Sequence, residues 1–178
     1  MSRRIACFLA LILACGAASH LRAQNQNDPL TEDEIQQIRD NAIHPDERIK
    51  LYMKFIAERL DAIRQVASPR ASADEKVEIH NKLDEFTSLC DELQDNLDTY
   101  DSAHADIRKS LKELVTVSGR WPPVISGLPP DKSYEFAQKV ALEAAQSAVD
   151  EAKHLSVEQD VYFDVNKKQR HGNGTGPS

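Results

Sequence analysis

The 178-residue sequence carries 22 Lys and Arg against 29 Asp and Glu, so its formal net charge is -7, and 40% of its residues are hydrophobic. This acidic balance argues against binding to nucleic acid or to anionic membrane surfaces. The length is sufficient for one domain with a buried core. Because no strand pattern appears and apolar residues recur at helical spacing, we expect an all-α protein.

The first residues have the features of an export signal. Arg3 and Arg4 precede an apolar run at residues 5–14, and small residues follow. This order is typical of a secretory signal, and the run is too short to span a membrane. We therefore exclude residues 1–23 from the fold and expect an exported protein, periplasmic or extracellular. Loss of the three arginines in this segment changes the net charge from -7 to -10.

Two processing routes are open for this signal. Cleavage after Ala23 would release a soluble protein with a flexible N-terminus at residues 24–30. Alternatively, residues 12–15 (ILAC) resemble a bacterial lipobox, with Cys15 as the lipidated residue. A lipid anchor on Cys15 would then be the protein's only attachment to a membrane.

Two helices are predicted at the start of the mature chain. Thr31 and Glu34 form a capping box that starts a short helix, which Pro45 ends. A second helix starts near Asp46, and its apolar residues follow the alternating spacing of four and three that packs one helix against others. These residues are Ile49, Met53, Ile56, Leu60, Ile63 and Ala67.

A longer helical pattern follows. Ser72 and Glu75 form another capping box. The same spacing of four and three then continues in phase to Ser118, which favours one long central helix at residues 73–118 and hence an elongated bundle. A break within residues 100–106 is the alternative. The repeated residues are Ile79, Leu83, Phe86, Cys90, Leu93, Leu97, Tyr100, His104, Ile107, Leu111, Leu114 and Ser118.

Gly119 ends this pattern, and residues 120–130 form a loop that contains four of the eight prolines. The loop is longer than usual between packed helices. It also holds apolar side chains that are unsuited to a freely mobile segment, so we expect it to fold back over the bundle. An exposed partner-binding patch is the alternative. In either case the residues concerned are Trp121, Val124, Ile125 and Leu128.

The last helix is predicted to run to about Gln159, with a buried face made mainly of alanine. The polar, glycine-containing residues 160–178 are predicted to form a disordered tail. Small side chains on the buried face would let neighbouring helices approach closely. This face comprises Tyr134, Ala137, Ala141, Ala144, Ala145, Ala148, Ala152 and Leu155.

Two carboxylate–histidine pairs form a candidate metal site. Asp101 and His104 are three residues apart, as are Glu151 and His154. Carboxylate-bridged di-metal bundles use paired Glu-x-x-His motifs of this kind. The sequence lacks a convincing fourth carboxylate ligand, so we expect no cofactor, and divalent-metal binding at these four residues is the alternative.

The sequence contains no nucleotide-binding, hydrolase or thiol-redox motif. Cys90 is the one cysteine of the mature chain, and its place in the apolar repeat predicts a buried side chain. We therefore expect an all-α, single-domain antiparallel helical bundle at residues 31–159. Its expected function is that of a non-enzymatic interaction or structural protein of the cell envelope, binding a protein partner or further copies of itself.

Overall fold

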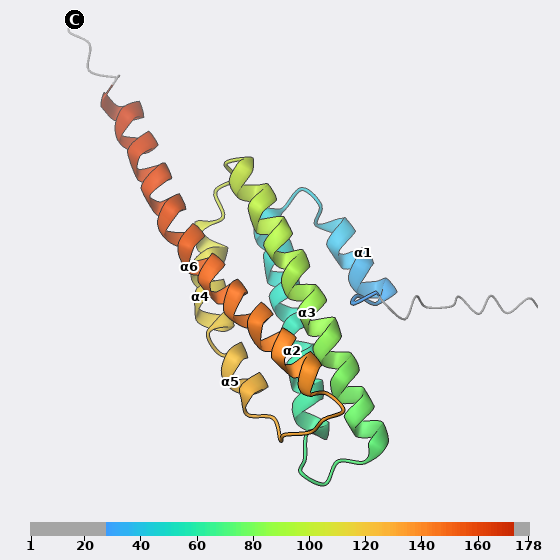
Figure 1. Cartoon of the computed structure of the whole chain (residues 1–178). Coiled ribbons are helices and arrows are strands. Elements are labelled where there is room, and N and C mark those ends of the chain that lie inside the picture. The colour runs from blue at the N-terminus through green and yellow to red at the C-terminus, as the bar shows by residue number, and fades with distance from the viewer. Residues whose placement is uncertain (1–27, 173–178) are drawn as a thin grey trace, which may run out of the picture.

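The computed structural model describes residues 28–172. For residues 168–172 it describes the backbone but not the side chains. The predicted signal, Cys15 and the Ala23 cleavage site lie outside these residues. Within residues 28–172 the chain is all-α and contains no strand, as predicted (Figure 1). Its helices are α1 (Glu32–Asp40), α2 (Pro45–Val66), α3 (Ala73–Ser102), α4 (Arg108–Ser118), α5 (Trp121–Ser126) and α6 (Glu135–Gly172).

The helices pack as an antiparallel bundle around α3. Helices α2 and α3 form an antiparallel pair, and α6 crosses α3 and α4 (Figure 1). The short helices α1 and α5 pack on α2 and α6, respectively. The predicted bundle is therefore confirmed.

The predicted helix starts follow from capping. The side chain of Thr31 accepts a hydrogen bond from the backbone of Glu34, and the Glu34 carboxylate accepts one from the Thr31 backbone. Ser72 and Glu75 form the same reciprocal pair at the start of α3. Each capping box satisfies backbone N–H groups that have no partner within the helix.

The core is built from the residues with the predicted spacing. The repeats of α2 and α3 are buried, apart from partly exposed Ala67 at the end of α2, and the alanine face of α6 is buried against them. Burial of apolar side chains contributes about 1.5–3 kcal/mol for each large residue, so this shared core is the main source of stability. Cys90 lies in it with no exposed surface.

The prediction of one continuous helix at residues 73–118 is wrong. Helix α3 ends at Ser102 and α4 begins at Arg108. The N–H of Ala105 donates to Tyr100 O, and the N–H of His104 donates to Asp101 O. With His104 at a φ of 53°, these two bonds form a Schellman ending. The sequence conceals the break because histidine, rather than glycine, occupies the left-handed position.

Gln159 of α6 holds this corner in place. Its side chain is buried, and its amide donates to Asp101 Oδ1 at 3.2 Å and to Ala105 O at 3.1 Å. Its amide oxygen accepts from the N–H of Ile107 at 3.2 Å. One side chain therefore satisfies backbone groups that the interruption between α3 and α4 would otherwise leave unpaired.

The predicted tail starts too early at residue 160, because α6 continues to Gly172. Two contacts with α4 support its continuation. Lys112 lies 3.4 Å from Asp160, and the guanidinium of Arg108 lies 4.7 Å from the centre of the Phe163 ring. Polar composition suggested disorder, but no proline interrupts the helical hydrogen bonds here. Residues 173–178 lie outside the described part of the chain.

None of the helices in the described residues is both long enough and apolar enough to cross a membrane.

Candidate functional site

The segment around Trp121 is helical rather than an irregular loop. Pro122 lies in the first turn of α5, where a helix does not need the missing N–H. Trp121 is 2% exposed, and its ring packs edge-on against Phe86 with centroids 6.0 Å apart. Ile125 has no exposed surface. The segment therefore folds back over the bundle, and Trp121, Ile125 and the 8% exposed Leu128 do not form an exposed patch.

Two hydrogen bonds, from Tyr134 and from Gln138 of α6, fix this segment. The Gln138 amide donates to Ile125 O at 2.8 Å, and the Tyr134 hydroxyl donates to Pro129 O at 2.5 Å. The segment after Trp121 is therefore held by a side chain of α6 and by one that directly precedes this helix. This leaves the outer surface of α5 in a defined position.

An open groove of about 700 Å³ lies between the end of α2 and α5. Two of the four predicted partner-binding residues, Val124 and Leu128, line it. Arg64 and Arg120 also line it, although sequence reasoning did not select them. Arg64 is distant in sequence, so no local signal indicated its place here. The complete lining is Arg64, Ala67, Gly119, Arg120, Pro123, Val124, Gly127, Leu128 and Pro129, which we call the α5 groove.

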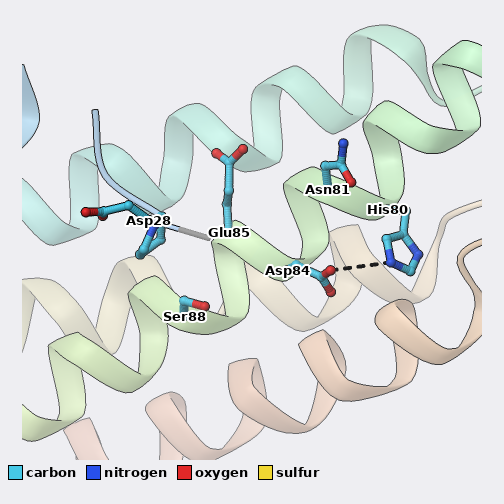
Figure 2. Close-up of a pocket in the computed structure, with 7 residues that line it drawn as sticks. Asp28, His80, Asn81, Asp84, Glu85 and Ser88 are labelled. Atoms are coloured by element: carbon cyan, nitrogen blue, oxygen red, sulfur yellow. Dashed lines mark ion pairs between the residues drawn. The ribbon is translucent and has the colours of Figure 1, made fainter. Parts of the chain in front are cut away.

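A second pocket, of about 530 Å³, lies where the N-terminal segment meets α3 (Figure 2). His80 Nε2 lies 3.4 Å from Asp84 Oδ2, and His80 Nδ1 lies 3.1 Å from Ser133 O. The histidine is therefore already engaged on both ring nitrogens. The pocket is lined by Asp28, Pro29, His80, Asn81, Asp84, Glu85 and Ser88.

A buried arginine links this pocket to α1. Arg59 donates to both oxygens of Glu34, at 2.6 and 2.7 Å, and to Pro29 O at 2.6 Å. Its Nε also lies 2.8 Å from Glu85 Oε2. Because one guanidinium holds residues of the N-terminal segment, α1 and α3, its main role is structural.

The charges of this network stabilise one another. Burial alone would raise the pKa of Glu34, but the hydrogen bonds from Arg59 and from the Thr31 backbone outweigh it, so the net shift is downward. The hydrogen bond to Glu34 raises the pKa of Arg59. Both groups are therefore charged in the folded protein at neutral pH.

The four candidate metal ligands do not come together. The described residues contain no group of three or more His, Cys, Asp and Glu side chains that could hold a metal ion. His104 stacks on Tyr162 with ring centroids 4.7 Å apart, whereas His154 lies 3.4 Å from Glu158. Asp101 accepts a hydrogen bond from Gln159. The expected helical alignment of Asp101 with His104 fails because α3 ends between them.

Cys90 does not have the environment of a reactive thiol. It is fully buried in the described structure, and burial raises the pKa of its thiol, with the nearby charge of Asp91 adding to the shift. A thiol held in its protonated form is a poor nucleophile. Its role is therefore that of a small core residue.

The C-terminal part of α6 presents apolar side chains to solvent. This part extends beyond the other helices (Figure 1). Its valines are spaced four residues apart and so share one side of the helix. Sequence reasoning missed Val161, Tyr162 and Val165 because it assigned residues beyond 159 to a tail. The α6 stripe comprises Val157, Val161, Tyr162 and Val165, which are 65%, 60%, 40% and 47% exposed.

The sequence matches no family model, and no curated protein or solved structure is significantly similar to the chain.

Proposed function

We propose that the protein is an exported, non-enzymatic helical bundle of the cell envelope that acts as an interaction module. Its binding surfaces are faces of its helices, chiefly the α6 stripe. The proposal of export depends on the charge, apolar run and small residues of the first 23 positions. Release after Ala23 and lipidation of Cys15 both place the bundle in the envelope or outside it.

The exposed α6 stripe is the observation that carries this proposal. A single exposed valine is ordinary, but three at helical spacing beside a half-exposed tyrosine form a continuous apolar surface. Valine also has a weak intrinsic preference for helix. Most helical stability in proteins comes from packing of an apolar face, and a partner on this stripe would supply that packing.

The arrangement of the polar residues supports a non-enzymatic role. His80 contacts Asp84 and the backbone carbonyl of Ser133, and His154 lies beside Glu158 on its own helix. Cys90 is buried. The His80–Asp84 and His154–Glu158 contacts each join residues one helical turn apart on the surface, as is common on helices. They give no reason to prefer the alternative of a metal-binding bundle.

Site-specific photo-cross-linking in cells tests the proposal. A photoreactive residue at Val161 is expected to give one reproducible cross-linked product in the envelope. Val77 provides a matched control, since it is an exposed valine (56%) on a different helix. The proposal is wrong if position 161 gives no product, or gives the same products as position 77.

A further inference from the structure

We infer that the α5 groove binds an extended acidic segment of a partner protein, with a carboxylate held by Arg64 and Arg120 and an apolar side chain packed on Val124 and Leu128. This inference rests on the proposed function in that both require a protein partner. It assigns a second surface, distinct from the α6 stripe.

The charge of the groove differs from that of the protein. The whole sequence has more acidic than basic residues. Among the described residues that line the groove, however, two are arginines and none is acidic. A concave surface with charge of one sign concentrates ligands of the opposite sign. The groove therefore favours an anionic ligand on an otherwise acidic molecule.

Both arginines of the groove have guanidinium N–H groups that are available to a ligand. Arg64 pairs only with Asp61, at 3.1 Å on its own helix, and its side chain is 57% exposed. Such an exposed pair is weak, so it can be exchanged for a ligand. Arg120 is exposed and has no ion-pair partner in the part of the chain that the structure describes. Guanidinium groups bind carboxylates through paired hydrogen bonds.

The remaining lining fits apolar side chains in an extended ligand. Half-buried Val124 and the 8% exposed edge of Leu128 line the groove together with Pro123 and Pro129, and the glycines at positions 119 and 127 add no side chains. The groove is open to solvent rather than enclosed, which suits a peptide better than a fatty acyl chain that must be surrounded. The bonds from Tyr134 and Gln138 keep α5 in place, so the ligand meets a groove that is already formed.

The test uses the full mature chain and two synthetic peptides. The first is an acetylated, amidated octapeptide that alternates leucine and glutamate, and the second has glutamine in place of glutamate. The first should bind with a Kd below about 1 mM and shift the NMR signals of Gly119 and Gly127. Arg120→Gln and Arg64→Gln should each weaken binding about tenfold, as expected for loss of a charged hydrogen bond. Arg39→Gln, on exposed α1, should leave binding unchanged.

Other results would overturn the inference. Equal binding of the glutamine peptide, or unchanged binding by both groove variants, would show that the arginines do not select an acidic ligand. Binding of dodecanoate or of phosphatidylglycerol vesicles at the groove, without binding of the peptide, would assign it to lipid instead. The buried Trp121 reports folding, so its unchanged emission in each variant excludes loss of structure as the cause.

The two proposals can fail separately. Peptide binding is measured on the isolated protein and involves no residue of the α6 stripe. Loss of the Val161 cross-link with intact peptide binding would reject only the α6 surface. Intact cross-linking without peptide binding would reject only the acidic segment in the α5 groove.

Discussion

At the scale of single residues, Arg59 is a buried charged group that joins three segments of the described structure. Its side chain is 9% exposed and contacts Glu34, Glu85 and Pro29 O. No local sequence pattern distinguishes it from the exposed Arg64 of the same helix, because its partners come from the N-terminal segment, α1 and α3. The sequence did predict Glu34 as part of a capping box, but not its second role as the partner of Arg59.

Replacement of Arg59 should be costly. Arg59→Met leaves the Glu34 carboxylate without its buried partner, so the free energy of unfolding should fall by about 3–5 kcal/mol. Urea denaturation followed by circular dichroism measures this change. Arg64→Met provides the control, since Arg64 is exposed and should change stability by less than about 0.5 kcal/mol. Equal effects of the two replacements would refute a structural role for Arg59.

The Glu34–Arg59 pair predicts that the stability of the protein depends on pH. The pKa of Glu34 is lowered in the folded protein, so its contribution to stability is present above the unfolded pKa of about 4.5. That contribution is lost as the pH falls through the folded pKa. Between pH 7 and pH 3 the free energy of unfolding should therefore fall more for the wild type than for Glu34→Gln. If urea denaturation gives the wild type and Glu34→Gln the same change in the free energy of unfolding with pH, Glu34 does not make this contribution.

At the scale of elements, the apolar repeat predicted which residues are buried better than where helices end. Positions such as Leu111 and Leu114 are buried as expected, although the helix that carries them is separate from α3. Ordinary capping boxes were recognised because their residue types are specific. The end of α3 was missed because His104 adopts a conformation that sequence reasoning assigns to glycine.

The helix α5 was missed for a related reason. Prolines usually interrupt helices, but Pro122 and Pro123 fall in the first turn, where their missing N–H groups cost nothing. Sequence reasoning selected Val124 and Leu128 of the α5 groove but could not predict its two arginines. Arg64 and Arg120 come together only through the packing of α2 against α5.

Gln159 should prove essential to the corner between α3 and α4. In Gln159→Leu, the N–H of Ile107 and the carbonyl of Ala105 lose their partner, which should lower the free energy of unfolding by about 1–3 kcal/mol. Gln146→Leu on the exposed side of α6 serves as the control and should be nearly neutral. Thermal or urea denaturation of both variants gives the comparison, and a neutral Gln159→Leu would be inconsistent with this role.

At the scale of the whole molecule, one core joins all the long helices, and α5 closes over one side of it. The only tryptophan reports on that closure. Trp121 is 2% exposed, so its fluorescence should be blue-shifted and resistant to acrylamide quenching. Emission typical of a solvent-exposed indole would mean that α5 does not cover the bundle in solution.

The central claim is that the C-terminal part of α6 is a binding surface for a partner in the envelope. Hydrogen exchange of the backbone amides at residues 165–172 tests it most directly, because this end of α6 lies beyond the contacts of Gln159, Asp160 and Phe163 with the bundle. An unsupported helix exchanges quickly and a packed one slowly. These amides should exchange rapidly in the isolated protein and become protected when the solubilised envelope fraction is added, while protection of α2 and α3 stays unchanged. Unaltered exchange at residues 165–172 after that addition would contradict the claim.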